Sequence, residues 1–355
     1  MSKRISTVHP IVVRRKALSW SQDDLATHAD IPRSSVSAIE SRRLTPSVAT
    51  ALAVARALKC SVEELFDEGR IDANREHPQW AFTPPTEACR YWEAEIGGRR
   101  WLYPVESLAI NAMAHDGLWQ QGVARDSSSS SSAHNTLVMA CCDPAAGLLA
   151  TEYARASGYR LLILQRGSDS ALAMLQQGLV HLAGVHRSTR EAPERNGATV
   201  RSKLGDGYRL LRAADWQEVL ALPAHNRMHS LTSIMRRCDR WAMREPGSAA
   251  RECLDEMLGK REATGCIVSS HAAVATAVHD GWASAGICVQ LSAEEVGLHF
   301  LPVRTESLDL CFAAAQAHDP RLQAFIRLIR SREHRRLLGE LPGYDARHTG
   351  ELVSV

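Results

Sequence analysis

The sequence has no segment that would place it in a membrane or direct it across one. No uncharged run approaches the roughly 18–20 residues of a membrane-spanning helix. The opening residues, MSKRISTVHP, lack the apolar core of a secretory signal. We therefore expect a cytoplasmic protein without a membrane partner.

Catalytic and metal-binding motifs are also missing. The chain contains no G-x-S-x-G, H-E-x-x-H, P-loop or G-x-G-x-x-G sequence. Its nine cysteines are scattered and include no C-x-x-C pair, which favours reduced, mostly buried thiols, with a thiol or metal sensor as the alternative. The sequence predicts a binding protein rather than an enzyme, without catalytic residues, metal ligands or a cofactor.

Lysine is scarce in the second part of the chain. From Asn135 onward only Lys203 and Lys260 occur, which disfavours a phosphate site clamped by lysine. The first 70 residues hold 11 Lys and Arg against 8 Asp and Glu, whereas the remainder holds 31 against 32. This asymmetry permits a polyanionic partner for the N-terminal part. The length of 355 residues is enough for two domains.

Short amphipathic helices are predicted throughout residues 1–70. Ser21 and Asp24 have the spacing of a capping box, and Pro32 suits the start of the following helix. Helical spacing gives the apolar positions that should face a core. These positions are Val36, Ile39, Leu52, Ala55 and Leu58.

Residues 71–134 differ in composition from the segments on either side and are expected to form a linker. Aromatic, alternating runs flank Gly97 and Gly98, which predicts a β-hairpin over residues 90–104. Six consecutive serines at 127–132 are typical of a low-complexity tether.

From residue 135 onward, short apolar runs alternate with helical stretches. Strands are predicted at 137–142, 160–164, 180–185, 265–268, 284–289 and 298–303, and helices at 145–157, 169–177, 248–259, 271–280 and 320–339. Such alternation indicates an α/β sheet with crossover connections. The expected fold class is multidomain, with an all-α head and an α/β C-terminal domain.

Four stretches of the head carry a family resemblance. They are Trp20-Ser-Gln-Asp-Asp-Leu-Ala26, Ile31-Pro-Arg-Ser-Ser-Val-Ser-Ala-Ile-Glu40, Pro46 to Leu58, and Ser61-Val-Glu-Glu-Leu-Phe66. Through them, residues 12–66 resemble the Cro/repressor type (XRE family) of helix-turn-helix domain. The resemblance implies that residues 1–70 bind a double-stranded, pseudo-palindromic DNA operator, as a homodimer. Asp30 stands where the family usually has a turn glycine, and aspartate tolerates the left-handed conformation.

The resemblance also implies which residues of the head contact DNA. Arg33 and Ser34 occupy the positions that read bases, and Gln22 matches a glutamine that contacts phosphate. Basic residues directly after the recognition helix suit further phosphate contacts. The expected DNA-binding residues are Gln22, Arg33, Ser34, Ser35, Ser37, Ala38, Arg42 and Arg43. A helical module that binds protein instead of DNA stays open.

The second part of the chain carries its own motifs. They include Cys142-Asp-Pro-Ala-Ala-Gly-Leu-Leu149, Gln165-Arg-Gly-Ser-Asp169, Arg244-Glu-Pro-Gly-Ser-Ala-Ala-Arg251 and Gly343-Tyr-Asp-Ala-Arg-His-Thr-Gly350. In order and spacing they resemble the periplasmic-binding-protein-like domain of molybdate-binding-type bacterial regulators. The resemblance implies a type 2 fold over residues 135–350, with two α/β lobes and a ligand cleft between them.

The motifs lie at strand-to-helix turns, where unpaired N–H groups and the helix dipole suit an anion. The expected ligand-binding residues are Asp143, Gly167, Ser168, His186, Gly247, Ser248, Ser270 and His271. Each has a purely structural alternative, as a turn glycine, a helix cap or a packed histidine. Arg166 and Arg251 are further candidates. The family's usual Gln-Pro-Gly-Ser-Gly-Thr-Arg reads Glu245-Pro-Gly-Ser-Ala-Ala-Arg251 here, so the ligand is either a molybdate-like oxyanion or another small anion or metabolite.

Together the two parts predict a transcription regulator that binds DNA and responds to a small-molecule effector. Two alternatives stay open. The C-terminal domain could lack a ligand and serve only dimerisation, or the chain could be a molybdenum-cofactor-related enzyme with an autoregulatory DNA-binding head.

Overall fold

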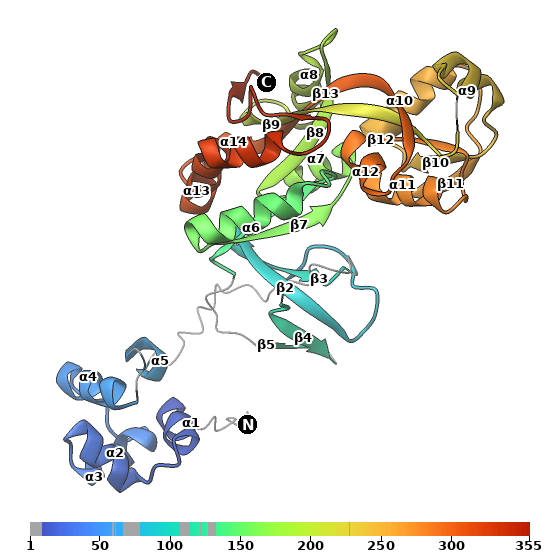
Figure 1. Cartoon of the computed structure of the whole chain (residues 1–355). Coiled ribbons are helices and arrows are strands. Elements are labelled where there is room, and N and C mark those ends of the chain that lie inside the picture. Colours follow the sequence, from blue (N-terminus) through green and yellow to red (C-terminus); the bar gives the residue numbers. More distant parts are fainter. Residues whose placement is uncertain are drawn as a thin grey trace. The chain divides into compact units, whose positions relative to one another are not determined.

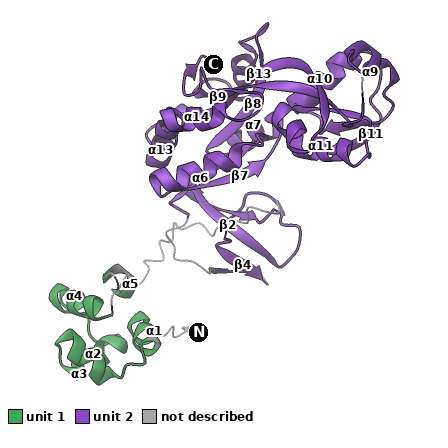
Figure 2. Ribbon diagram, viewed as in Figure 1, with its two compact units in different colours: residues 1–76 green, residues 77–355 purple. Residues whose placement is uncertain are grey.

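The computed structural model divides into two compact units, residues 1–76 and residues 77–355, drawn in green and purple in Figure 2. It describes residues 9–58, 60, 62–66, 79–106, 114–120, 122–126, 133–226 and 228–355. The serine run at 127–132, expected to be a tether, lies outside the described residues. Within the described part, the helices are too short or too polar to cross a membrane.

The described part of unit 1 is helical, as the sequence predicts. Its helices are α1 (Pro10–Ala17), α2 (Gln22–Ala29), α3 (Arg33–Glu40), α4 (Val48–Ala57) and α5 (Val62–Phe66), shown in blue in Figure 1. Their apolar faces enclose one small core, which includes Leu25, Val36, Ile39, Val54 and Leu58. The short helices depend on this shared burial, because isolated helices of this length are unstable in water.

Local signals in unit 1 were largely predictive. The Ser21 hydroxyl accepts the Asp24 N–H at 3.1 Å and the Asp24 carboxylate accepts the Ser21 N–H at 2.7 Å, so the capping box is confirmed. Asp30 ends α2 in the left-handed conformation, with φ 49°. The prediction for Leu52 is wrong, since this side chain is 41% exposed. Val54 faces the core instead. Side chains two positions apart on a helix point in directions that differ by about 200° around the helix axis, so Leu52 faces away from the core.

Unit 2 begins with a small sheet. Its strands are β1 (Gln79–Trp80), β2 (Cys89–Ile96), β3 (Arg99–Pro104), β4 (Gly117–Gln120) and β5 (Val123–Asp126), in the order β1-β3-β2-β4-β5. The antiparallel β2 and β3 turn at Gly97 and Gly98, whose φ angles of 59° and 80° favour glycine. The sheet packs against the following α/β domain, and the Tyr103 hydroxyl donates to the Leu179 carbonyl at 2.7 Å.

The rest of unit 2 forms two α/β lobes. Lobe 1 contains β6 (Thr136–Cys141), β7 (Arg160–Gln165), β8 (Leu182–Thr189), α6 (Ala146–Ser157), α7 (Ser168–Gln176), α8 (Arg195–Leu204), α13 (Pro320–Ile329) and α14 (Arg332–Gly339). Lobe 2 contains α9 (Leu231–Arg237), β10 (Trp241–Arg244), α10 (Ala249–Leu258), β11 (Gly265–Val268), α11 (His271–His279), β12 (Ala285–Val289) and α12 (Gln290–Glu295). Hydrophobic clusters lie in each lobe, so each has its own core.

Two long strands, β9 (Tyr208–Leu222) and β13 (His299–Ala313), join the lobes (Figure 1). They pair antiparallel over nearly their whole length, and the large sheet has the order β11-β10-β12-β9-β13-β8-β6-β7. The register of β13 shifts between Pro302 and Arg304 and again between Leu308 and Asp309. Such irregularities bend a strand locally. The short β14 (Tyr344–Asp345) and β15 (Leu352–Val353) also pair with β9.

The predicted combination of an all-α head and a two-lobed α/β domain is therefore confirmed, with three corrections to its elements. The strand predicted at 298–303 continues to Ala313. The helix predicted at 320–339 is two helices, because Ser331 caps a new helix by accepting the N–H of His334. The long strand β9 was not predicted at all.

Candidate functional site

The exposed side of α3 is the candidate nucleic-acid interface. Val36 and Ile39 are buried, whereas Arg33 and Ser34 are exposed at the N-terminal end of the helix. This is the arrangement that a recognition helix needs, with one face packed on the domain and polar side chains free to reach base edges. The remaining predicted positions on α3, Ser35, Ser37 and Ala38, are half-buried.

Exposed arginines lie at both ends of α3. The Arg33 Nε lies 3.3 Å from Asp23 Oδ2, and both side chains are mostly exposed, so solvent competes with this ion pair. Arg42 and Arg43 are exposed just after α3, where Arg42 adopts a φ of 57° and Arg43 donates to Ser41 Oγ at 2.9 Å.

Gln22, the predicted phosphate contact, belongs to a network that holds the head together. Its Nε2 donates to Glu40 Oε2 at 2.7 Å. Arg15 donates to both oxygens of the same carboxylate, at 2.7 and 3.1 Å, and its Nη1 donates to the Trp20 carbonyl at 2.7 Å. Burial alone would raise the pKa of Glu40, but the hydrogen bonds from Arg15 and Gln22 lower it.

The second candidate site lies where the helix N-termini of the two lobes meet. Gly167 caps α7 in lobe 1, and a Cβ there would lie 2.6 Å from Glu245 Oε1 and 3.2 Å from Ser248 Cβ in lobe 2. Gly247, with φ 84°, has Asp169 directly beside it, and the Asp169 N–H donates to its carbonyl at 3.4 Å. The glycines predicted to bind ligand therefore permit close contact between the lobes.

Arg187 links the lobes beside these turns. From β8 in lobe 1 its Nη2 donates to Glu252 Oε1 at 2.6 Å and to the Gly247 carbonyl at 3.0 Å, both in lobe 2. Its Nη1 also pairs with Asp169 at 2.9 Å. The arginine is only 6% exposed, so this ion pair is less screened than one on the surface.

A buried chain of three side chains runs through the site. The Cys142 sulfur lies 3.0 Å from His186 Nε2, and His186 Nδ1 lies 2.7 Å from Glu306 Oε2. Burial alone would lower the pKa of His186, but Cys142 and Glu306 raise it well above its usual range. Burial would likewise raise the pKa of Cys142, yet His186 and Arg244 lower it.

Several buried polar atoms around this chain have no hydrogen-bond partner among the described residues. They are Ser168 Oγ, Trp216 Nε1, Arg244 Nη1 and both ring nitrogens of His271. Ring contacts join His186, Trp216 and His271, with centroids 4.9 to 6.0 Å apart, and the charge of Arg244 acts on His271 and Cys142. These atoms come from both lobes and from the connecting strand β9.

Two of the predicted ligand residues, Ser248 and Ser270, serve as helix caps, and Asp143 is hydrogen-bonded in the turn before α6. Asp143 Oδ1 accepts the Ala145 N–H at 2.9 Å and the Tyr344 hydroxyl at 2.5 Å. Ser248 accepts the Arg251 N–H and donates to the Glu245 carbonyl, and Ser270 accepts the Ala273 N–H. The structure thus brings all eight predicted positions to the region between the lobes, but only Ser168 and His271 leave side-chain donors unpaired.

The sequence motifs do not identify four further residues of the site, Trp216, Arg244, Glu306 and Arg187. Arg244 stands directly before Glu245-Pro-Gly-Ser, so an arginine at the end of a strand was the available signal. Its Nε and Nη2 bind Glu245 at 2.9 Å each. The other candidate arginines point elsewhere, because Arg166 pairs with Glu106 and Arg251 pairs with Asp255 on its own helix.

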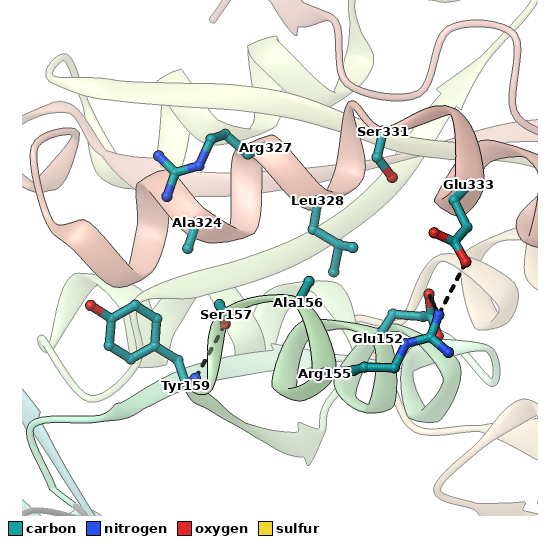
Figure 3. A pocket seen from close by; sticks show the side chains of 10 residues that line it. All are labelled: Glu152, Arg155, Ala156, Ser157, Tyr159, Ala324, Arg327, Leu328, Ser331 and Glu333. Atoms are coloured by element: carbon teal, nitrogen blue, oxygen red, sulfur yellow. Dashed lines mark hydrogen bonds and ion pairs between the residues drawn. The ribbon is translucent and has the colours of Figure 1, made fainter.

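Lobe 1 also has an open surface pocket of about 650 Å³, shown in Figure 3. It lies between α6 and the helices α13 and α14. Arg155 on α6 pairs with Glu152 on the same helix and with Glu333 on α14, at 3.1 Å each. None of the eight predicted ligand residues lines this pocket. Its lining mixes charged residues with small and apolar ones, and the pocket is separate from the cluster between the lobes.

Comparisons with known proteins match each unit separately. Residues 13–65 match the helix-turn-helix family, and residues 150–330 match the PBP superfamily domain. YvgK, an uncharacterized protein of Bacillus subtilis (strain 168), is 27% identical over 198 residues, which are 53% of this chain and 64% of that protein. The chain therefore spans less than two thirds of this relative's length.

Solved structures resemble the chain only distantly. PhnD1 from Prochlorococcus marinus (MIT 9301), in complex with methylphosphonate, has a TM-score of 0.44 and 10% identity, covering 62% of this chain and 93% of its own. An ABC-type phosphate transport receptor from Vibrio cholerae has a TM-score of 0.42 and 13% identity, covering 59% and 99%. Likeness at this level does not indicate a shared ligand.

Proposed function

Because the chain belongs to the PBP superfamily and carries a helix-turn-helix domain, we propose that it is a DNA-binding transcription regulator controlled by a small ligand. Both matched families are binding families and neither is catalytic, in line with the expectation of a non-enzyme. In this proposal the head binds double-stranded DNA, the two lobes hold the effector, and the protein acts in the cytoplasm as a homodimer on a pseudo-palindromic operator.

The observation that carries the ligand half of the proposal is the group of unpartnered buried donors between the lobes. Each buried polar group without a partner destabilises a protein by about 1–3 kcal/mol. A ligand with several acceptor atoms would remove this penalty at Ser168, Trp216 and Arg244 together. The N-termini of α7, α10 and α11 favour an anion, so a molybdate-like oxyanion is the ligand class we propose.

Burial of the site indicates how binding would be coupled to a change of state. Ser168, His186 and His271 are each 0% exposed, so a ligand reaches them only when the lobes separate. A ligand that contacts both lobes binds the closed arrangement better than the open one and shifts the population toward it. Regulation then requires that the open and closed forms differ in DNA affinity.

The test begins with thermal unfolding of the full chain against molybdate, tungstate, sulfate, phosphate and small organic anions. A specific ligand should raise Tm in proportion to the logarithm of its concentration. Ser168→Ala should reduce that shift, since it removes one donor without breaking a protein hydrogen bond. Ser157→Ala, at the far end of α6, is the control and should leave the shift unchanged.

DNA binding is tested in the same preparation. Duplexes selected from a random library supply a target, and fluorescence anisotropy gives Kd with and without the stabilising ligand. A change of at least fivefold in Kd would support ligand control. If the chain selects no DNA sequence, or if saturating ligand leaves Kd unchanged, the proposed function is wrong.

A further inference from the structure

One sulfur and two imidazoles converge between the lobes. Cys142 follows β6, His186 lies on β8, and His271 opens α11 in the other lobe. Ligand atoms of these three side chains all lie within 4.8 Å of one another, and all three side chains are buried. This spacing is small enough for a single ion to contact one atom from each.

We propose that Cys142, His186 and His271 form a binding site for a thiophilic transition-metal ion such as Zn²⁺ or Cu⁺. Thiolate and imidazole are the ligands that these ions prefer, whereas Mg²⁺ and Ca²⁺ require oxygen. The proposal names an effector class for the inter-lobe site, and its regulatory meaning rests on the proposed function. Three protein ligands leave a coordination position open, so a metal ion and a small anion are compatible occupants.

His186 is already oriented as a metal ligand. Its Nδ1 is held by Glu306 Oε2 at 2.7 Å, which directs Nε2 toward the Cys142 sulfur at 3.0 Å. Metal-binding histidines commonly use one ring nitrogen for the ion and the other for a carboxylate that fixes the ring. The Glu306 side chain is fixed in turn, because Arg304 pairs with its other oxygen at 2.6 Å.

His271 supplies the independent observation. The residue is 0% exposed, and neither ring nitrogen has a hydrogen-bond partner among the described residues. A fully buried imidazole with both nitrogens unpaired is unfavourable. Coordination of an ion would satisfy one nitrogen and would join lobe 2 to the two ligands of lobe 1.

Neighbouring charges are compatible with a bound cation. Arg244 lies close enough to influence Cys142, but Glu245 binds its guanidinium through two hydrogen bonds of 2.9 Å and offsets its charge. A second grouping, His186 with Glu218 and Glu306, shares one histidine with the first. It is the weaker candidate, since both oxygens of Glu306 already have partners in His186 and Arg304.

The experiment uses the full chain, reduced and stripped of metal with a chelator, titrated with Co²⁺ as a spectroscopic probe and then with Zn²⁺. The expected result is a thiolate-to-cobalt charge-transfer absorption at one equivalent, which Zn²⁺ abolishes by displacement. Cys142→Ala should eliminate the absorption. His271→Gln should weaken Co²⁺ binding by at least about tenfold. Cys266→Ala, which removes a half-buried thiol outside the cluster, is the control and should retain the absorption.

His271→Gln is the safeguard against misfolding, because its ring makes no hydrogen bond that the substitution would break; unfolding curves confirm that each variant is folded. Absence of the absorption in the wild-type chain, or its persistence in Cys142→Ala, would overturn the metal site. Zn²⁺ binding with no effect on the Kd for selected DNA would leave the metal site intact and contradict its role as an effector site. DNA binding that depends on an anion, in a protein that shows no cobalt absorption, would support the proposed function and overturn the metal site.

Discussion

The guanidinium of Arg187 in lobe 1 binds the carboxylate of Glu252 in lobe 2, with Nη2 and Oε1 2.6 Å apart. The same guanidinium holds the Gly247 carbonyl, next to the cap of α10. One side chain thus fastens the first turn of a lobe 2 helix to a lobe 1 strand. The Arg187–Glu252 ion pair therefore stabilises the closed arrangement of the lobes, and a single substitution can remove it.

Glu252→Gln should favour separation of the lobes. The amide keeps the shape of the side chain but removes the charge that Arg187 binds. We expect the unfolding free energy to fall by about 1–2 kcal/mol, less than for a fully buried pair because Glu252 is one third exposed. Small-angle scattering should show a larger radius of gyration without ligand. Asp255→Asn is the matched control, since its partner Arg251 lies on the same helix. Equal effects of the two variants would contradict a role in closure.

Arg33→Ala should reduce sequence discrimination by the head. If Arg33 reads a base, its loss weakens binding to the selected DNA by about 1–3 kcal/mol, or roughly 5- to 150-fold, and weakens binding to random DNA much less. Anisotropy with both duplexes measures this difference. Arg56→Ala, an exposed arginine on α4, is the control. Equal losses on both duplexes would indicate a phosphate contact instead.

Arg15→Ala should destabilise the head without removing a DNA contact. The substitution removes two hydrogen bonds from the Glu40 carboxylate, whose side chain is only 6% exposed, and leaves the one from Gln22. Hydrogen bonds to charged groups contribute about 1.5–3 kcal/mol. Calorimetry of the full chain should show the head unfolding at a lower temperature while unit 2 is unchanged. Lys16→Ala removes an exposed charge from the same helix and should have little effect. A shift in the unfolding of unit 2 would contradict this assignment.

Glu218 should make stability depend on pH. Burial, and then the charge of Glu306, raises the pKa of Glu218 from 4.5 to about 8. Between these values the folded protein keeps a proton that the unfolded chain has lost, so stability falls as pH rises. One pKa unit corresponds to about 1.4 kcal/mol, and Glu218→Gln should therefore stabilise the protein by a few kcal/mol more at pH 8 than at pH 5.

Urea unfolding from pH 5 to pH 8 measures that difference between wild type and Glu218→Gln. Glu262→Gln, at an exposed position after α10, is the control and should follow the wild-type profile. If the profiles of wild type and Glu218→Gln run parallel, the Glu218 carboxyl does not retain its proton in the folded protein.

Local patterns in the sequence predicted unit 1 well because its elements are set by neighbours in the chain. The capping pair Ser21 and Asp24 and the spacing of Val36 and Ile39 depend on positions three apart. The register of β9 depends instead on distant partners. Arg212 and Asp215 interrupt its apolar pattern, and their partners Asp309 and Ser307 lie on β13.

The residues of the candidate site also fall into two groups, those that local motifs predict and those that distant strand pairing places there. Motifs identified Ser168 and His271, which lie at strand-to-helix turns, and His186 on a short apolar strand. Trp216 and Glu306 belong to the two long strands, one missed and one predicted too short. Glu306 comes close to His186 because β13 pairs with β8, and these two residues are 120 positions apart in the chain. Trp216 is placed beside Glu306 by the pairing of β9 with β13. Local sequence patterns do not predict such distant pairings.

The two register shifts of β13 fall on either side of the segment that carries Arg304 and Glu306. If the lobes rotate about these irregularities, the segment between them moves with the rotation. His186, which is hydrogen-bonded to Glu306 on this segment, would then move relative to the rest of the cluster. The angle between the lobes and the distance between Cys142 and His186 would then change together. A reporter of that contact, such as the absorption of a bound cobalt ion, would read the angle directly.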